Sequence, residues 1–511
     1  MMKYYLGIDI GTGESKGVLI DSGCRVVCSA TCSHETHNPR PGWFEHDAER
    51  VWWGDFCKLS RELLSRSGIE STSIGCVGLS ALGCDCVPVD DECRALAPAI
   101  LYGIDARSQP QIDILLSTYG EAGVREMIGH DPCSSDIAPK VMWFYDNMPE
   151  VAARAAKFLT ASSYLCAKLT GRFCIDRYLA EDFLPMYNRD TWEVDKGGCK
   201  GFCRPDQMAE VMSATDIAGA VTMRAAEETG LAPGTPVLVG TGDSGAEAIS
   251  TGVAVPGDMM VQMGSSCYFI YLSDRMVEDA RLWPGTFIIP GTYGICAGTN
   301  TAGTLTKWVR DQFYRDALQD ERAGGPDAFE IMAREAADVS PGADGLVCLP
   351  YFAGERTPLN DPAARGVLFG LTVGHTRGHV CRAAIEGIAF TVAAHVDILE
   401  REHGLVINRL MAVGGGTKNP VWLQAVADAC GKQVRTARVT IGACFGDALM
   451  AALAGGECAS WDELVQRVGE GGVIEPDPVV HKLYQNRRSV FDELYQRNCD
   501  LMHALGNGFG W

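Results

Sequence analysis

The sequence predicts a mixed α/β protein built from two related domains, and three observations lead to this class. Short apolar runs that are typical of strands alternate with helix-like segments along the chain. The strand–turn–strand pattern near the N-terminus returns at residues 258–272, which indicates a second domain on the same plan. Gly-rich turns follow strand-like runs at four places, residues 11–15, 241–245, 264–266 and 414–416.

The first predicted elements form a β-meander. Tyr4–Ile10 is a strand, residues 11–15 form a turn, and residues 16–20 form a second strand. A further turn leads to a third strand at residues 25–27. Two later segments follow in order, a buried strand at 74–79 and a helix over 151–169 that ends at Thr170-Gly171.

The second half of the chain continues the alternation. A strand at 236–240 precedes the turn at 241–245 and an Ala-rich helix start, and the second domain begins near residue 253. Arg409–Val413 reads as a strand, after which Asn419 caps a helix with Pro420 in its first turn and Gly431 ends it. An amphipathic helix over 479–504 is expected to pack on the outside.

Composition narrows the class of function. With 511 residues the chain has room for two or three domains, and 44 basic against 65 acidic residues give a net charge of −21. This charge disfavours nucleic acid and anionic membrane surfaces as partners, and no apolar stretch is long enough to span a bilayer. The N-terminus does not resemble a signal peptide, and the 21 cysteines lack zinc-site spacing, so we expect reduced thiols and a cytoplasmic protein.

The Gly-rich turns suggest phosphate binding. A single turn of this kind is usually explained by the positive φ that Gly tolerates. Here Thr or Ser stands beside Gly in two of the turns, and the carboxylates of Asp9 and Asp243 lie at or next to two of them. Backbone donors with a nearby carboxylate are what a nucleotide triphosphate and its Mg²⁺ require. The Walker pattern is absent, so a P-loop enzyme is excluded.

Several motifs carry a resemblance to a known family. GIDIGTGESKGVLID (7–21), QMGSS (262–266) and MAVGGGTKNP (411–420) resemble the two phosphate motifs and the adenosine motif of the actin-like ATPase superfamily. Within that superfamily the chain resembles the FGGY carbohydrate kinases, and among these the xylulokinases most. The further matching segments are 138–147, preceded by an unusual Ile137, 349–358 (LPYFAGERTP) and 366–386 (GVLFGLTVGHTRGHVCRAAIE).

The resemblance implies two actin-like (ribonuclease H-like) α/β domains flanking a deep cleft. Residues 1–252 would form the N-terminal FGGY domain, with the sugar site and the first phosphate hairpin. Residues 253–511 would form the C-terminal FGGY domain, which binds ATP and carries the C-terminal helix. The implied activity transfers the γ-phosphate of ATP, with Mg²⁺, to a hydroxyl of a small sugar. D-xylulose, giving D-xylulose 5-phosphate, is the favoured acceptor. Another pentulose, a tetritol or glycerol is the alternative.

The resemblance also implies roles for individual residues. Asp243 would accept the proton of the sugar hydroxyl, and Asp9 would lie near Mg²⁺, although each could instead be a turn or capping Asp. The phosphate contacts would be Gly11, Thr12, Gly13, Lys16, Gly264, Ser265 and Ser266. The adenosine contacts would be Gly414, Gly415, Gly416 and Asn419. Lys16 could equally be a solvated charge at a strand edge, and Asn419 could simply be the helix cap described above.

The sugar pocket departs from the family pattern. Its expected residues are Ala81, Leu82, Gly83, Cys84, Asp105, Asp243 and Ser244. Residues 80–84 lack both the His of xylulokinases and the Arg-Glu pair of glycerol kinases, and Ser244 stands where these enzymes have Asn or Gln. The acceptor therefore stays open, as does a homodimer. A non-kinase actin-like ATPase and a degenerate sugar-binding regulator are the alternatives from other classes.

Overall fold

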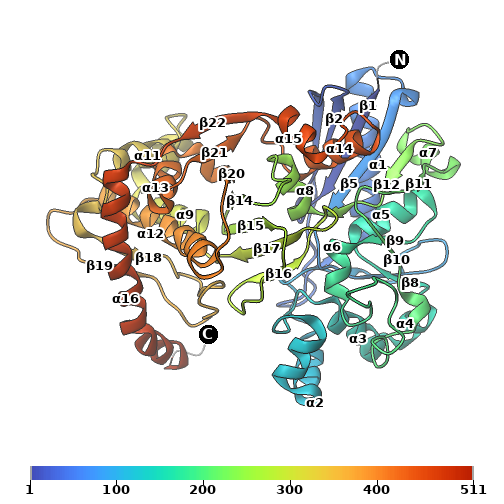
Figure 1. The fold of residues 1–511 in the computed structure, drawn as a ribbon, viewed down its shortest axis with the longest axis horizontal. Coiled ribbons are helices and arrows are strands. Elements are labelled where there is room, and N and C mark those ends of the chain that lie inside the picture. Colours follow the sequence, from blue (N-terminus) through green and yellow to red (C-terminus); the bar gives the residue numbers. More distant parts are fainter. Residues whose placement is uncertain (1–2, 509–511) are drawn as a thin grey trace. The chain divides into compact units, whose positions relative to one another are not determined.

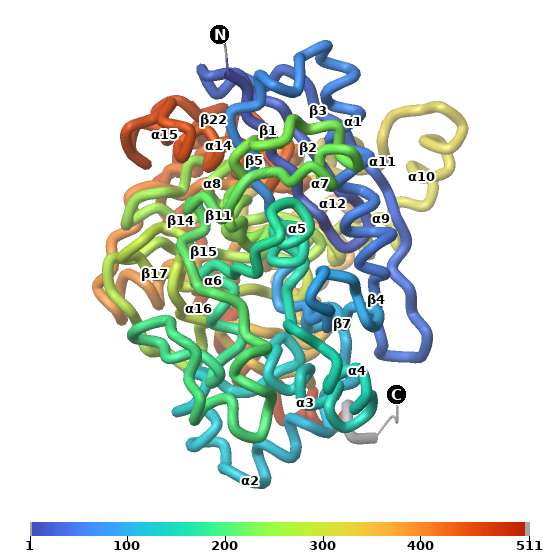
Figure 2. Tube along the Cα trace, turned by 90° about the vertical axis from the view of Figure 1, so that its right-hand side faces the viewer, coloured from blue at the N-terminus to red at the C-terminus, as the bar shows by residue number. Residues whose placement is uncertain are grey.

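The computed structural model describes residues 3–508, whose course is drawn in Figures 1 and 2. The chain forms two compact units. The first unit runs to Ala254 and includes Gly285–Tyr293 and Ile441–Gly469. The second unit comprises Val255–Pro284, Gly294–Thr440 and the chain from Glu470 onward. The sequence-based division after residue 252 assigned 285–293 and 441–469 to the C-terminal domain, whereas in the structure both segments pack with the first unit.

Specific contacts explain why these two segments belong to the first unit. Thr286 donates hydrogen bonds from its backbone N and its Oγ1 to Glu181 Oε1, at 3.1 and 2.7 Å. The ring of Phe287 packs edge-on against Tyr178, with 5.9 Å between centroids. Helix α14 (Ala443–Ala454) packs directly on the sheet of the first unit.

The first unit is built around a seven-stranded sheet. Its order is β11-β12-β5-β1-β2-β3, and β13 also pairs with β5. The strands are β1 (Tyr4–Ile10), β2 (Glu14–Asp21), β3 (Val26–Ser33), β5 (Ile74–Ala81), β11 (Ile217–Ala220), β12 (Pro236–Leu238) and β13 (Thr241–Gly242). The predicted meander and the strand at 74–79 are confirmed, although β3 extends well beyond the predicted residues 25–27.

Successive side chains of β1 point to opposite faces of this sheet, and their contacts show which helix covers each face. A Cβ on Gly7 would lie 2.0 Å from the carbonyl oxygen of Cys444 in α14, so this face is covered by α14. Ile8 points the other way and pairs with Gly17, where a Cβ would meet Leu63 of α1 (Gly54–Ser67). Asp9 therefore lies on the face of α14, as its two-residue spacing from Gly7 requires.

The remaining elements of the first unit surround this sheet. Its helices are α2 (Gln109–Ile128), α3 (Ile137–Asn147), α4 (Pro149–Arg154), α5 (Ala161–Thr170), α6 (Arg177–Ala180), α7 (Met223–Thr229), α8 (Asp243–Ser250) and α15 (Trp461–Val468). Its short strands are β4 (Glu45–His46), β6 (Val87–Val89), β7 (Ala99–Ile100), β8 (Lys157–Leu159), β9 (Cys174–Asp176) and β10 (Glu210–Met212).

Two predicted elements of the first unit are wrong. The single helix over 151–169 is divided into α4, β8 and α5, because residues 157–159 pair with β6 and Thr160 caps a new helix. The predicted turn at 241–245 is also not a turn. Residues 241–242 form β13 beside β5, and α8 begins at Asp243. In both cases pairing with a distant strand overrides the local pattern.

The second unit contains a seven-stranded sheet of the same plan. Its order is β16-β17-β15-β14-β20-β21-β22, so an antiparallel hairpin again lies beside a parallel strand. The strands are β14 (Asp258–Met263), β15 (Cys267–Ser273), β16 (Trp283–Thr286), β17 (Tyr293–Gly298), β20 (Arg409–Val413), β21 (Val434–Ala437) and β22 (Glu470–Ile474). The repeat of the first hairpin and the strand Arg409–Val413 are confirmed.

Helices complete the second unit. They are α9 (Gly303–Phe313), α10 (Arg315–Arg322), α11 (Ala328–Ala337), α12 (Arg377–Asp397), α13 (Pro420–Cys430) and α16 (Pro478–Gly508), with a small β18 (Val347–Leu349) and β19 (Val367–Phe369) ladder. Asn419 caps α13 and Gly431 ends it with a φ of 63°, as predicted. Helix α16 buries Tyr484, Phe491 and Leu494 against the core of this unit. Within residues 3–508 no helix has the length and apolar character needed to cross a bilayer.

Candidate active site

Two partly exposed carboxylates mark one end of the first sheet. Asp9 is the penultimate residue of β1, and Asp243 is the first residue of α8, where its Oδ1 accepts a hydrogen bond of 2.6 Å from the backbone N of Ser244. The pKa of Asp9 is raised mainly because its carboxylate is poorly hydrated, and to a smaller extent by the negative charge of Asp243. Restricted solvation also raises the pKa of Asp243. The structure thus brings the two predicted acids close enough to influence one another.

A third carboxyl group lies behind Asp9. Ser80 of β5 is the register partner of Asp9, and its Oγ lies 3.0 Å from Asp9 Oδ1 and 2.7 Å from Asp447 Oδ2. Asp447 belongs to α14 and is fully buried. On the other side of β1, Lys16 is the register partner of Asp9 and forms an exposed ion pair of 3.4 Å with Glu14.

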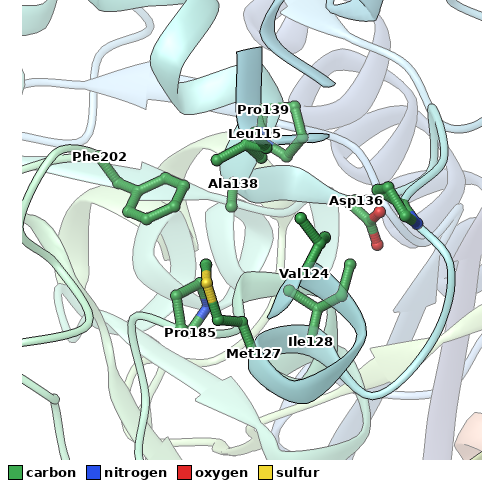
Figure 3. A pocket seen from close by; sticks show the side chains of 10 residues that line it. Leu115, Val124, Met127, Ile128, Asp136, Ala138, Pro139, Pro185 and Phe202 are labelled. Carbon is green, nitrogen blue, oxygen red and sulfur yellow. The ribbon is translucent and has the colours of Figure 1, made fainter. Parts of the chain in front are cut away.

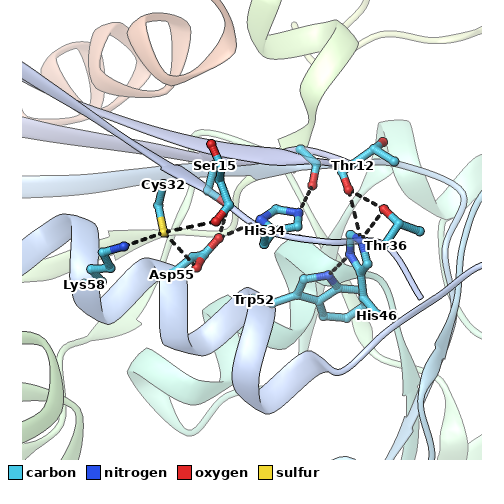
Figure 4. A network of polar contacts seen from close by, with 11 residues as sticks. Thr12, Ser15, Cys32, His34, Thr36, His46, Trp52, Asp55 and Lys58 are labelled. Carbon is cyan, nitrogen blue, oxygen red and sulfur yellow. Dashed lines mark hydrogen bonds and ion pairs between the residues drawn. The ribbon is translucent and has the colours of Figure 1, made fainter.

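The turn from Gly11 to Gly13 is held by side chains on the face opposite to α14 (Figure 4). The carbonyl oxygen of Gly11 accepts from His34 Nε2 at 3.1 Å. That of Thr12 accepts from Thr36 Oγ1 at 2.6 Å and from His46 Nε2 at 3.1 Å. In a trans peptide the N–H points away from the preceding carbonyl, so the N–H groups of Thr12 and Gly13 point away from this network. The turn therefore presents amide donors, as an anion site requires.

Asp55 anchors the network from α1. Its Oδ2 accepts from His34 Nδ1 at 2.8 Å and from Ser15 Oγ at 2.7 Å, and Figure 4 shows these groups in line with Cys32 and Lys58. Burial opposes the charge of His34, but the hydrogen bond and the charge of Asp55 outweigh it and raise the pKa of His34. Burial likewise opposes the charge of Asp55, yet the bonds from His34 and Ser15 lower the pKa of this carboxyl group. The two groups form a buried ion pair.

His46 is the neutral member of the network. Burial and the neighbouring His34 lower its pKa to about 4. The indole Nε1 of Trp52 can only donate, and it lies 3.0 Å from His46 Nδ1. His46 Nδ1 is therefore the acceptor, and Nε2 carries the hydrogen that is donated to Thr12.

The residues expected to face the sugar gather near Asp243. Cys84 Sγ donates to Asp182 Oδ2 at 3.2 Å, and Tyr178 hydroxyl lies 2.9 Å from Ser244 Oγ. A Cβ on either Gly83 or Gly242 would lie 3.2 Å from Leu179 Cδ2, so these segments all meet at α6. Ala81 and Leu82 are buried in the wall behind them.

Acidic groups dominate this region. Burial raises the pKa of Asp182 to about 7. Burial, with a contribution from the charges of Asp243 and Asp182, also raises the pKa of Asp85, whose Oδ2 has no hydrogen-bond partner within residues 3–508. Lys140 is the nearby buried cation, and its three N–H donors are taken by the carbonyl oxygens of Cys84, Ser134 and Ser135 at 2.7, 2.7 and 3.1 Å.

Asp105 has a different environment. It is fully buried, and its oxygens accept from the backbone N of Phe44 at 2.6 Å and from the Arg107 guanidinium at 2.8–3.0 Å. Arg107 also pairs with Glu45 at 2.8 Å and stacks over Trp43 at 4.2 Å. Residues 102–107 (YGIDAR) and 42–47 (GWFEHD) thus meet, and Asp105 supports this cluster. Its expected contact with substrate stays a prediction.

The second hairpin turn lies in the second unit and is held differently. The backbone N of Gly303 donates to Gly264 O at 2.9 Å, and those of Ala302 and Thr304 donate to Ser265 O at 3.0 and 2.9 Å. The adjacent Gly-rich segment approaches the same hairpin, since a Cβ on Gly414 or Gly416 would lie 2.8 Å from Met263 O or 2.7 Å from Met263 Cβ.

The structure therefore gathers the predicted nucleotide residues in two groups, each within its own unit. The first unit holds Asp9, 11–13, Lys16 and Asp243. The second holds 264–266, 414–416 and Asn419, whose Oδ1 accepts from the backbone N of Val421 and Trp422 at 3.0 and 3.2 Å. Asn419 thus serves as a helix cap, and its adenosine contact stays a prediction.

One enclosed cavity lies away from these residues (Figure 3). It is lined by apolar side chains of α2 and α3, among them Leu115, Val124 and Ile128, with Asp136 at its edge. Its volume of about 10 Å³ is that of a single water molecule at most. A sugar does not fit there.

Some site residues were missed by the sequence analysis. Ser80 was treated only as part of the changed pocket wall, and Asp447, Asp182, His34 and Asp55 were not considered. The one available signal was an Asp within the otherwise apolar run of α14. A charged residue at such a position calls for a partner.

Comparison with known proteins places this site in context. Sequence models of the FGGY family of carbohydrate kinases match residues 4–250 with the N-terminal domain and 259–455 with the C-terminal domain. The xylulose kinase of Escherichia coli (strain K12) is 27% identical, with 98% of this chain and 100% of that protein covered. The gluconokinase of Bacillus subtilis (strain 168) is 25% identical, with 97% and 96% covered. The crystal structure of xylulose kinase from Rhodospirillum rubrum superimposes with a TM-score of 0.88 at 27% identity, covering 98% of this chain and 100% of that one.

Proposed function

Because the chain belongs to the FGGY family of carbohydrate kinases, we propose that it transfers the γ-phosphate of ATP to a hydroxyl of a small neutral sugar, with D-xylulose as the first candidate. The observation that carries this proposal is the pairing of Asp9 and Asp243 at the end of the first sheet, beside the amide donors of Thr12 and Gly13. This arrangement provides a carboxylate that can accept a proton and, beside it, amide groups that can bind phosphate.

Asp243 acts as the general base in this proposal. Its raised pKa suits proton acceptance near neutral pH, and its partly exposed position leaves the carboxylate accessible to a hydroxyl. Transfer of a phosphoryl group needs little early deprotonation, so Asp243 chiefly orients the hydroxyl and receives its proton late. The hydrogen bond from Ser244 N holds the carboxylate in place.

Asp9 is suited to hold Mg²⁺. The ion commonly keeps several waters and binds through one or two carboxylates together with phosphates. Asp9 offers one partly exposed carboxylate, which fits that mode better than an all-protein cage; no group of three or more His, Cys, Asp or Glu within residues 3–508 could form one. Bound Mg²⁺ would neutralise charge on the transferring phosphoryl group. In the second unit, the turn at 264–266 and the segment 414–416 are proposed to hold the rest of the nucleotide.

The charge of the pocket favours a neutral acceptor over a sugar acid such as gluconate. Asp85, Asp182 and Asp243 lie near one another, and each donor of Lys140 is already committed to a carbonyl oxygen. A carboxylate on the substrate would therefore meet the negative charge of Asp243 with no N–H donor of Lys140 left to balance it, which costs binding energy. Cys84 and Ser244 match neither the xylulokinase nor the glycerol kinase pattern, so the experiment below compares pentuloses, a tetritol and glycerol.

A mass-spectrometric screen tests the proposal. The purified protein is incubated with ATP and Mg²⁺ and, in separate reactions, with D-xylulose, other pentuloses, erythritol, glycerol and gluconate. We expect an acceptor-dependent sugar phosphate, with D-xylulose best and gluconate unreactive. ATP turnover equal in all reactions, including one without sugar, would favour a non-kinase ATPase instead. Thermal stabilisation by a sugar with no product would favour a sugar-binding regulator.

A further inference from the structure

The Ser80 hydroxyl lies between two carboxyl groups. Its oxygen is 3.0 Å from Asp9 Oδ1 and 2.7 Å from Asp447 Oδ2, both within hydrogen-bond distance. A serine hydroxyl has one hydrogen and can donate to only one of them. The other contact is favourable only if the carboxyl group supplies the hydrogen. One of the two carboxyl groups is therefore a neutral acid.

Burial identifies Asp447 as that acid. Its side chain is fully buried and its Oδ1 has no hydrogen-bond partner within residues 3–508, whereas Asp9 is partly exposed and lies opposite Lys16. An ionised carboxylate is strongly disfavoured in such a place, because it loses its water and gains no partner for Oδ1. Burial and then the charge of Asp9 also raise the pKa of Asp447 well above its usual value.

The backbone holds Asp447 firmly against β5. A Cβ on Gly78 would lie 2.0 Å from the carbonyl oxygen of Asp447, and one on Gly446 would lie 1.9 Å from Ala246 O of α8. Helix α14 is thus fitted into the space that these glycines leave, and the carboxyl group of Asp447 has little freedom to turn away from Ser80.

We propose that Asp447 is a positioning residue that acts as a neutral carboxylic acid: it donates to Ser80, and Ser80 donates to Asp9. This relay fixes one oxygen of Asp9 and keeps its carboxylate charged, so that the second oxygen is directed to the magnesium-bound phosphates. The inference rests on the proposed kinase function. A direct role for Asp447 as a metal ligand does not fit a side chain with no exposed surface.

Substitutions separate a hydrogen-bond donor from a carboxylate. Asp447→Asn keeps a donor for Ser80, whereas Asp447→Leu keeps the branched shape, is larger, and has no donor. We expect Asp447→Asn to retain kcat within about threefold, and Asp447→Leu and Ser80→Ala to lose about 10- to 100-fold, as for other supporting groups around metal-binding carboxylates. Ser60 of α1 has an equally buried hydroxyl, which donates to the carbonyl oxygen of Thr229 in α7. Ser60→Ala is therefore the matched control, and we expect its kcat to be unchanged.

Two outcomes would overturn the proposal. If Asp447→Asn is as impaired as Asp447→Leu, a carboxylate is needed at this position and the relay is wrong. If Asp447→Leu is as active as the unmodified protein, Asp447 positions nothing. Melting temperatures of all variants show whether a loss of kcat comes from loss of fold.

Infrared spectroscopy tests the proton without any assay of phosphorylation. The difference spectrum between the unmodified protein and Asp447→Asn at neutral pH is expected to contain the carbonyl band of a protonated carboxyl group. If the substitution instead removes the two stretching bands of an ionised carboxylate, the inference is wrong. Because this measurement needs no sugar, failure of the relay is distinguishable from failure of the proposed function.

Discussion

The two sheets use the same hairpin but equip it differently. In the first unit Asp9 is one residue from the end of β1 and is paired with Ser80 of the parallel strand β5. The equivalent residue of β14 is Gln262, which is paired with Val413 of β20. The first hairpin thus has a carboxylate beside a hydroxyl group at this position, whereas the second has a side-chain amide beside an apolar residue.

The support of the two turns differs in the same sense. The carbonyl oxygens of Gly11 and Thr12 are held by ionisable or polar side chains, among them His34 and His46. Those of Gly264 and Ser265 are held by backbone N–H groups at the start of α9. The first hairpin thus carries an acid and has a charged support, whereas the second is held by backbone groups. We infer that the chemistry is carried out at the first.

Asp243→Asn should have the largest effect on activity. The amide is similar in size but cannot accept the proton of the acceptor, so we expect kcat to fall by about 10³-fold, within the range for loss of a general base. MgATP affinity, measured by calorimetry, should change less than about threefold. An Asp243→Asn or Asp243→Ala enzyme that keeps more than a tenth of the original kcat would refute the assigned role.

Asp9→Asn makes the first hairpin resemble the second. We expect kcat to fall by about 100-fold and the Mg²⁺ concentration for half-maximal rate to rise, because the carboxylate near the metal is lost. Gln262→Ala is the matched change in the second hairpin and should lower kcat less than about fivefold. Equal losses for the two variants would show that the hairpins do not differ in the way proposed here.

His34→Gln tests the charged support of the first turn. It leaves Asp55 buried without its partner, so the free energy of unfolding should fall by about 3 kcal/mol, and KM for ATP should rise by about tenfold while KM for the sugar is unchanged. Urea unfolding and steady-state kinetics measure these effects. His37→Gln is the control, because His37 is highly exposed and its partner Glu45 keeps Arg107, so the change should cost under about 1 kcal/mol.

The same pair predicts a pH dependence. The pKa of His34 is raised above its unfolded value of about 6.5, so its contribution is complete below that pH and is lost as pH rises through the folded-state pKa. The pKa of Asp55 is lowered below about 3.9, so its contribution is lost only as pH falls through that lowered value. The penalty of His34→Gln should therefore be largest between about pH 4 and pH 6.5 and smaller at pH 9. A penalty that grows toward pH 9 would contradict this ion pair.

Two Gly→Ala changes test the two turns separately and should have smaller effects. A Cβ on Gly303 would lie 2.5 Å from Gly264 O, so Gly303→Ala should lower the melting temperature by several degrees and raise KM for ATP. A Cβ on Gly13 meets nothing within 4 Å, so Gly13→Ala should leave the melting temperature unchanged. If phosphate approaches this turn closely, Gly13→Ala should still raise KM for ATP by about three- to tenfold. An unchanged KM for ATP would show that phosphate does not approach Gly13.

Local patterns predicted much of the fold and part of the site. The hairpins, Arg409–Val413 and the cap at Asn419 depend on neighbours in sequence and were predicted correctly. The helix over 151–169 was wrong because β8 exists only through its pairing with β6. The contact between Ser80 and Asp447 joins residues 367 positions apart, and no local pattern specifies such a contact.

A crystal structure with a non-hydrolysable ATP analogue, Mg²⁺ and the acceptor found in the screen would show whether the reaction takes place at Asp9 and Asp243. We expect the terminal phosphate on the amides of Thr12 and Gly13, the metal beside Asp9, and the acceptor hydroxyl within about 3 Å of an Asp243 oxygen. A terminal phosphate bound at the turn 264–266 alone, with the acceptor hydroxyl away from Asp243, would contradict this expectation.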